Sequence, residues 1–131
     1  MASVVVIDDD RSINRMICKS LEKEGYQRYS AYTLSDGYKA ECRAQPEVVF
    51  LDHSMPDGNG LAWLPDLLDV ESAPEVIVIT ATGSGQSVEN AIFRGAWDYV
   101  QKPFLEGSLA HLVRQPLRYR HDKQGKKNWL R

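Results

Sequence analysis

Five short runs of hydrophobic residues alternate along the chain with segments whose hydrophobic residues recur at helical spacing. The runs are residues 4–7, 26–31, 48–51, 76–80 and 97–100. Four of them are rich in Val, Ile or aromatic residues and are bounded by polar residues, a pattern that predicts buried strands. The run at 26–31 is more polar and predicts a strand nearer an edge of the sheet.

The segments between the runs predict amphipathic helices. Ile13, Ile17 and Leu21 share one helical face, and Gly25 is well placed to end that helix. Thr33 is typical of a helix N-cap, and further hydrophobic stripes follow within residues 60–70, 86–94 and 105–113. Strand and helix therefore alternate five times. This order predicts an α/β fold with a doubly wound, five-stranded parallel sheet and helices on both faces.

The last predicted helix contains Pro116, which has no backbone N–H to donate. A proline in a helix interior costs about 3 kcal/mol. We therefore expect this helix to kink or to end near residues 113–115, and we expect residues 119–131 to form a basic tail or linker after a domain spanning residues 1–118.

Length and composition agree with one domain that buries its own core. The chain has 131 residues, of which 43% are hydrophobic and 26% are charged. Cys18 and Cys42 fall inside predicted helices, so we expect free, buried or half-buried thiols in a reducing cytosol rather than a disulfide. No hydrophobic run approaches the roughly 18 residues that a membrane helix requires. The sequence predicts a cytoplasmic protein that does not enter a membrane.

The net charge of −2 hides an asymmetry along the chain. Residues 1–113 carry 9 Lys or Arg against 17 Asp or Glu, whereas residues 114–131 carry 7 against 1. An acidic body argues against direct binding of nucleic acid by the domain itself.

Chemically reactive side chains stand where the predicted strands end. The first strand is followed by Asp8, Asp9 and Asp10, and the third ends at Asp52. The fourth ends at the hydroxyl of Thr80, and the fifth is followed by the amine of Lys102. In parallel α/β sheets, functional groups gather beyond the carboxyl ends of the strands. Asp10 is explained as the N-cap of the next helix. The other acids would repel one another unless a cation lay among them, and carboxylate oxygens suit Mg²⁺.

Four motifs together resemble the receiver domain of two-component response regulators, the CheY-like fold. They are Val4-Val-Val-Ile-Asp-Asp-Asp10, Leu51-Asp-His-Ser-Met-Pro-Asp-Gly-Asn-Gly-Leu61, Val78-Ile-Thr-Ala81 and Gly95-Ala-Trp-Asp-Tyr-Val-Gln-Lys-Pro-Phe104. The resemblance covers roughly residues 3–118. It implies the flavodoxin-like strand order 2-1-3-4-5.

The resemblance also implies a phosphoryl-acceptor site. Asp52 matches the phosphoacceptor. Asp9 and Asp52 would hold Mg²⁺ through their side chains, Asp8 would act through water, and Ser54 would contribute its backbone carbonyl. The ionised Asp52 carboxylate can attack phosphorus without a general base.

The remaining roles implied by the family concern the phosphoryl group and the switch. Thr80 and the backbone of Ala81 would donate to the phosphoryl oxygens, Lys102 would pair with one of them, and the Tyr99 ring would turn inward on activation. Ser54 and Thr82 match positions that flank the pocket and tune the lifetime of the phosphorylated form. In many members of the family the peptide bond that joins Lys102 to Pro103 is cis. His53 stands where the family more often has an apolar or acidic residue. Its side chain would face solvent or pack against its neighbours, and the alternative is a role in gating the phosphoryl group.

These residues predict a response regulator receiver that takes a phosphoryl group from a sensor histidine kinase or a phosphotransfer protein. The stretch 96–104 and the loop 83–85 are similar to receivers of NtrC-type transcriptional activators, so the tail would lead to an output domain beyond Arg131. A phosphorylation-dependent homodimer is a further expectation, although Pro116 argues against a dimer that needs a straight last helix. Catalysis would be limited to the protein's own phosphorylation and dephosphorylation.

Two other functions use some of the same residue types. A small phosphohydrolase with an aspartyl-phosphate intermediate needs its nucleophile as the first acid of an Asp-x-Asp motif on the first strand, whereas the candidate here is on the third strand. A pseudo-receiver that never takes phosphate would lack one of the acids, the threonine or the lysine. All of them are present.

Overall fold

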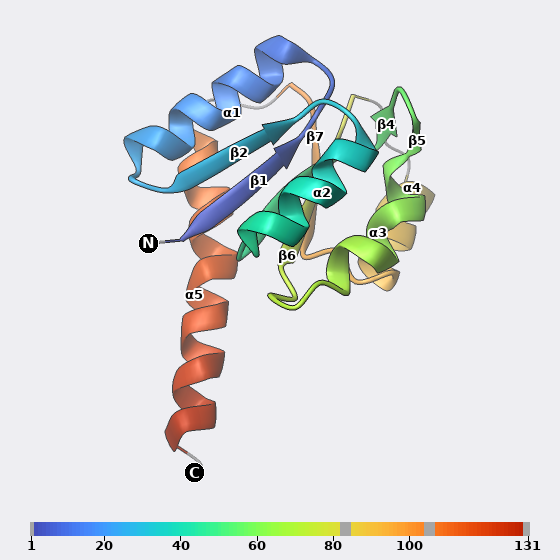
Figure 1. Cartoon of the computed structure of the whole chain (residues 1–131). Coiled ribbons are helices and arrows are strands. Elements are labelled where there is room, and N and C mark those ends of the chain that lie inside the picture. Colours follow the sequence, from blue (N-terminus) through green and yellow to red (C-terminus); the bar gives the residue numbers. More distant parts are fainter. Residues whose placement is uncertain (1, 82–84, 104–106, 130–131) are drawn as a thin grey trace.

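The computed structural model describes residues 2–81, 85–103 and 107–129, with side chains described as far as Lys123. Five parallel strands form a sheet in the order β2-β1-β3-β6-β7 (Figure 1). This order confirms the predicted doubly wound fold. The strands are β1 (Ser3–Ile7), β2 (Gln27–Ala31), β3 (Val48–Asp52), β6 (Glu75–Thr80) and β7 (Asp98–Gln101). Each predicted run therefore lies within one or two residues of a strand.

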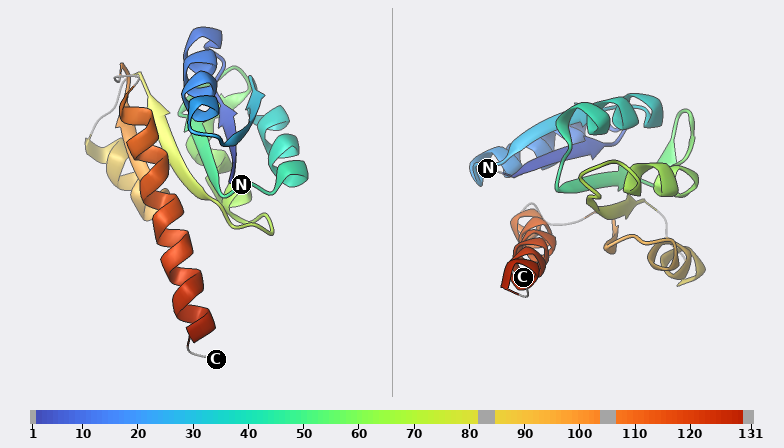
Figure 2. Two further views of the ribbon diagram at one scale, coloured as in Figure 1. Left: turned by 90° about the vertical axis from the view of Figure 1, so that its left-hand side faces the viewer. Right: turned by 60° about the horizontal axis from the view of Figure 1, so that its bottom comes forward.

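Helices cover both faces of the sheet. One face carries α1 (Arg11–Lys23) and α5 (Ser108–Trp129), and the other carries α2 (Leu34–Ala44), α3 (Gly60–Leu68) and α4 (Gly85–Phe93). Figure 2 shows these two helical layers from the side and from below.

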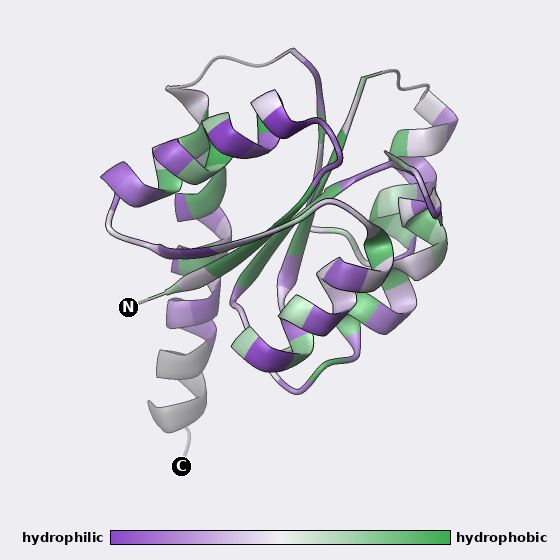
Figure 3. Ribbon diagram, turned by 45° about the horizontal axis from the view of Figure 1, so that its top comes forward, coloured by the Kyte–Doolittle hydropathy of each residue, from purple (hydrophilic) through white to green (hydrophobic). Residues whose placement is uncertain are grey.

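Side chains that point alternately to the two faces of the sheet form a hydrophobic core on each face. Val5 and Ile7 of β1 pack with α2 and α3, whereas Val4 and Val6 pack with α1 and α5. Successive side chains of a strand point to opposite faces, so four consecutive buried residues serve two helical layers. In Figure 3 the central strands are mostly hydrophobic, while the outward sides of the helices are hydrophilic.

The helix starts agree with the capping residues in the sequence. Asp10 accepts hydrogen bonds from the backbone N–H groups of Ser12 and Ile13, and Thr33 accepts one from that of Asp36. These bonds satisfy amides that have no partner inside the helix. Gly25, with a φ of 85°, follows the C-cap of α1 as expected.

The prediction that the last helix ends near residues 113–115 is wrong, while a kink at Pro116 stays a prediction. α5 runs without interruption from Ser108 to Trp129 with Pro116 inside it. Packing on both sides of the proline accounts for this, because Leu109 and Val113 are buried in the core and Arg120 is bonded to the loop before β6. The helix includes residues 119–129, for which the sequence predicted a tail or linker. The division of the chain at residue 118 stays a prediction.

Three other features complete the fold. A hairpin of two short strands, β4 (Ser54–Met55) and β5 (Gly58–Asn59), follows β3 and was not predicted. Strand β2 lies at an edge of the sheet, as its polar sequence suggested, and four of its five residues are exposed. Both cysteines are free thiols; Cys18 is half-buried as expected, but Cys42 is exposed.

Within the described part of the chain, no helix is long and apolar enough to cross a membrane.

Candidate functional site

Carboxyl groups from two neighbouring strands meet at the carboxyl edge of the sheet. Asp8 and Asp9 follow β1, and Asp52 is the last residue of β3, which pairs directly with β1. Each of the three residues offers a carboxylate oxygen, and these oxygens all lie within 4.8 Å of one another. Asp8 and Asp52 are buried, with relative exposures of 0% and 5%, whereas Asp9 is exposed.

Lys102 brings a positive charge into this acidic cluster. Its Nζ lies 2.9 Å from Oδ2 of Asp8 and 3.3 Å from Oδ2 of Asp52, and its side chain is only 13% exposed. The backbone places it there, because the Lys102 N–H donates to the carbonyl of Thr80 at the end of β6. Burial alone would lower the pKa of Lys102, but the two carboxylates outweigh burial and the pKa is raised.

One lysine does not neutralise the cluster. Burial, followed by the negative charge of Asp8, raises the pKa of Asp52 to about 7, although Lys102 and the Ser54 N–H act in the opposite direction. A raised pKa means that the charged form is held unfavourably. A further cation would remove this cost, and a set of carboxylate oxygens suits a hard divalent ion such as Mg²⁺. The acidic cluster therefore fits the metal that the sequence predicted.

A buried asparagine fixes the backbone next to Asp8. The side-chain amide of Asn14, on α1, donates to the carbonyls of Val6, Asp8 and Ala31 at 3.4, 3.0 and 3.2 Å. These contacts tie the carboxyl ends of β1 and β2 to α1. Sequence reasoning missed Asn14, but its position beside Ile13 and three residues before Ile17 was a signal, because it places a polar residue on the buried face of the helix.

The hairpin after Asp52 is held at both ends. At its base, the Gly60 N–H donates to the His53 carbonyl at 2.7 Å, and a Cβ at Gly60 would overlap the carbonyl oxygen of Asp52. At its tip, the Asp57 carboxylate accepts from the N–H groups of Leu34 and Ser35, at 2.8 and 3.1 Å. Asp57, also missed from the sequence, thus joins this hairpin to the start of α2. These backbone bonds lower the pKa of Asp57.

The predicted switch residues lie beside the acidic cluster or on the adjoining strands. Thr80 ends β6 and is buried, and Ala81 follows it with an exposed side chain. Tyr99 lies in β7 and packs against the core shared with α2 and α3, and its buried hydroxyl has no hydrogen-bond partner among the described residues. The Lys102–Pro103 peptide bond is cis, as the resemblance implied. Thr82 and the loop 83–84 lie outside the described residues.

A comparison with protein families gives this arrangement its context. The family model of the response regulator receiver domain matches residues 4–114. The chain belongs to this family. A receiver is a signalling domain, which agrees with a site that holds acids, a hydroxyl and an amine at one sheet edge.

Known receivers include relatives of this one that regulate transcription. The receiver is 34% identical over 118 residues to the KDP operon transcriptional regulatory protein KdpE of Escherichia coli, and 34% identical over 123 residues to the DNA-binding transcriptional regulator NtrC of Proteus hauseri. These matches cover 90% and 93% of the chain but only 52% and 26% of the relatives. The chain thus spans about half the length of the first and a quarter of the second.

The fold of the receiver is also that of solved structures. The crystal structure of NtrX from Brucella abortus matches with a TM-score of 0.89 and 26% identity, over 98% of this chain and 30% of that chain. The likeness therefore extends over nearly the whole chain, including most of α5.

Proposed function

We propose that this receiver accepts a phosphoryl group on Asp52 from a sensor histidine kinase or a phosphotransfer protein, in a reaction that depends on Mg²⁺. The observation that carries the proposal is the meeting of Asp8, Asp9 and Asp52 within 4.8 Å, with the Lys102 amine against two of them. A cluster of this charge, with two of its three acids buried, has a clear chemical use as a place where a dianionic phosphoryl group and a cation meet.

The metal ligands would come from two neighbouring strands and the hairpin after Asp52. Asp9 and Asp52 would bind Mg²⁺ through their side chains, Asp8 through a water molecule, and Ser54 through its backbone carbonyl. The ion would supply positive charge to the transferring phosphoryl oxygens. The raised pKa of Asp52, caused by burial and by Asp8, supports this assignment because a bound cation would stabilise the ionised carboxylate.

The transfer itself asks little of the protein beyond placement and charge. A bond forms between a carboxylate oxygen of Asp52 and phosphorus, while the bond from phosphorus to the donor's imidazole nitrogen breaks and its electron pair stays on the imidazole. Lys102 neutralises charge on the phosphoryl oxygens, and the Thr80 hydroxyl and the Ala81 N–H donate to them. Water later attacks the acyl phosphate and resets the domain. Ser54 and Thr82, which match the positions through which the family tunes that rate, would set it here.

The readout would be a shift between two states of the face formed by α4, β7 and α5. When Thr80 moves toward the phosphoryl group, space opens for the ring of Tyr99. Its buried hydroxyl has no hydrogen-bond partner among the described residues, so a rearrangement would break no hydrogen bond described for that hydroxyl. This face would control an output domain beyond Arg131, or a homodimer, and through it transcription.

Intact-mass analysis after incubation with acetyl phosphate and Mg²⁺ tests the proposal. One added phosphoryl group is expected in the wild type and none in Asp52→Asn. Asp66→Asn is the matched control, because Asp66 is an exposed acid on α3. Equal labelling of wild type and Asp52→Asn would exclude Asp52 as the acceptor. Release of many equivalents of phosphate from a generic phosphate ester would favour a phosphohydrolase instead.

A further inference from the structure

The second half of α5 leaves the sheet on the edge opposite the acidic cluster. Figures 1 and 2 show that residues 117–129, here called the distal segment, project past the amino ends of the strands. The segment begins directly after Pro116. Because proline has no N–H, the carbonyl of Leu112 cannot accept the usual helical bond from residue 116, and the helix has one bond fewer at this point. The distal segment therefore depends on contacts of its own.

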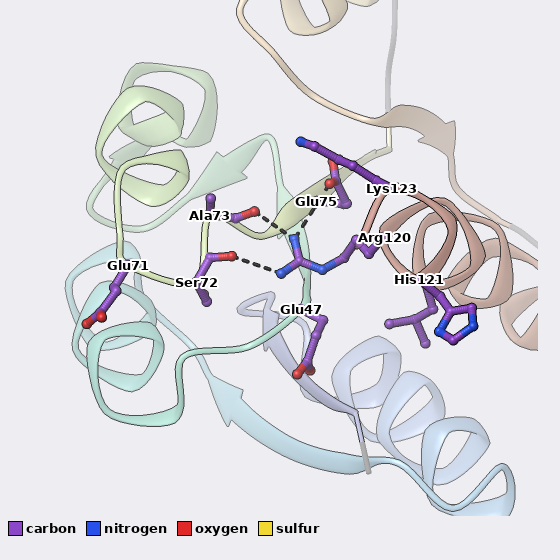
Figure 4. Close-up of a pocket in the computed structure, with 9 residues that line it drawn as sticks. Glu47, Glu71, Ser72, Ala73, Glu75, Arg120, His121 and Lys123 are labelled. Atoms are coloured by element: carbon purple, nitrogen blue, oxygen red, sulfur yellow. Dashed lines mark hydrogen bonds and ion pairs between the residues drawn. The ribbon is translucent and has the colours of Figure 1, made fainter. Parts of the chain in front are cut away.

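Arg120 supplies the most specific of these contacts. Its guanidinium donates through Nη1 to the carbonyl of Ala73 at 2.7 Å and through Nη2 to that of Ser72 at 2.9 Å. Nη1 also lies 3.6 Å from the carboxylate of Glu75. Figure 4 shows this group reaching from α5 toward Ser72, Ala73 and Glu75. The pocket around it, of about 620 Å³, is lined by residues of α5 and of the amino edge of the sheet. A planar fork of donors suits two adjacent carbonyls, and an ammonium group does not reproduce it.

The acceptor loop is itself built to present these carbonyls. Ala73 has a φ of 45°, in the left-handed region that a residue with a Cβ rarely adopts. The loop is held from the other side as well, because the Ser72 N–H donates to Oε1 of Gln45 at 2.7 Å. Such a conformation persists where the surrounding contacts impose it. Arg120 is one of the groups that impose it.

The contacts of the distal segment fall on the two strands that carry the switch residues. Glu75, the partner of Arg120, begins β6, which ends at Thr80. Tyr119 packs on Trp97, with ring centroids 5.1 Å apart, and Trp97 lies just before β7, which contains Tyr99. The distal segment thus rests on the amino ends of strands whose other residues border the acidic cluster.

We infer that Arg120 is a latch that holds the distal segment as a helix against the start of β6. Release of this one side chain frees the segment after Pro116 while the rest of the domain stays folded. The inference goes beyond phosphorylation and does not require it. The latch gives the domain a second control point, on the edge opposite Asp52, for any segment that α5 leads to.

Amide hydrogen exchange of the full chain, followed by mass spectrometry, tests the latch. In Arg120→Ala, peptides from residues 117–129 are expected to exchange at least about tenfold faster than in wild type, while peptides from β1 and β3 keep their rates. Arg120→Lys is expected to fall between the two. Glu75→Gln, which leaves both carbonyl bonds in place, is expected to change the rate by less than about threefold.

Arg118→Ala is the matched control. Arg118 is exposed on the same segment, and its replacement brings the same helix propensity and the same loss of charge. Three results would overturn the inference: unchanged exchange in Arg120→Ala, an equal rise throughout the domain, or the same rise in Arg118→Ala. Phosphorylation of Asp52 in Arg120→Ala is measured in parallel by intact mass, so a failure of the latch and a failure of the proposed phosphotransfer are told apart.

Discussion

Glu41 gives the sharpest prediction on stability. Its carboxyl group, on α2, is completely buried, and neither oxygen has a hydrogen-bond partner among the described residues. Burial raises the pKa of Glu41 from 4.5 to about 8. Above pH 4.5 the unfolded chain therefore releases a proton that the folded chain keeps, so the free energy of unfolding falls as pH rises. The limiting slope is about 1.4 kcal/mol per pH unit, and the interval up to pH 8 corresponds to roughly 5 kcal/mol.

Urea unfolding, followed by tryptophan fluorescence between pH 5.5 and 7.5 in EDTA, measures this effect. Glu41→Leu and Glu41→Gln both remove the titrating group, so the difference in unfolding free energy between each variant and wild type should widen by close to 1.4 kcal/mol per pH unit. Glu41→Leu should be the more stable of the two, because glutamine still buries an unpaired amide. The other titrating groups, Asp52 among them, contribute equally to all three proteins. Parallel curves for wild type and Glu41→Gln would refute the reasoning.

Three further predictions concern the acidic cluster and its hairpin. Lys102→Met should raise the pKa of Asp52 further, which carbon-13 NMR titration measures, and should slow the labelling of Asp52 by acetyl phosphate, which intact mass measures. An unchanged pKa of Asp52 would contradict the ion pair. Asp9→Asn should abolish the rise in melting temperature that Mg²⁺ gives the wild type. Without Mg²⁺, the free energy of unfolding of the variant should stay within about 0.5 kcal/mol of the wild-type value. Asp57→Ala should cost about 1 kcal/mol in urea unfolding, and Asp57→Asn less, because the amide oxygen still caps α2.

The strands and the chemistry at their ends could be predicted from the sequence because both depend on local composition. Buried parallel strands are continuous runs of Val and Ile, and the topology then brings their carboxyl ends to one edge. Asp52 and Lys102, 50 residues apart, were placed together by this argument alone.

Features that depend on contacts between distant segments were missed. The local cost of Pro116 predicted a kink or an early end of the helix. The helix does not end there, because the burial of Val113 and the bonds of Arg120 come from tertiary packing. The hydrogen bond from the Leu34 N–H, at the start of α2, to the Asp57 carboxylate also joins residues far apart in the chain. Glu41 is different, since it follows Leu34 by seven residues and shares its helical face. Its position on the buried face of α2 predicted a buried side chain, whereas its charge predicted an exposed one.

The open edge of the sheet has a consequence for the behaviour of the protein at high concentration. Among the residues that the structure describes, no strand pairs with the outer side of β2, so its backbone groups there could template a strand from another molecule. Three of its four exposed residues, Gln27, Arg28 and Ser30, are polar, and the fourth is Tyr29. The polar residues make that edge a poor template, and the charge of Arg28 is paired with Glu22 on α1. Replacing Arg28 with a β-branched apolar residue should make the exposed edge strand β2 prone to intermolecular β-aggregation, which thioflavin fluorescence detects.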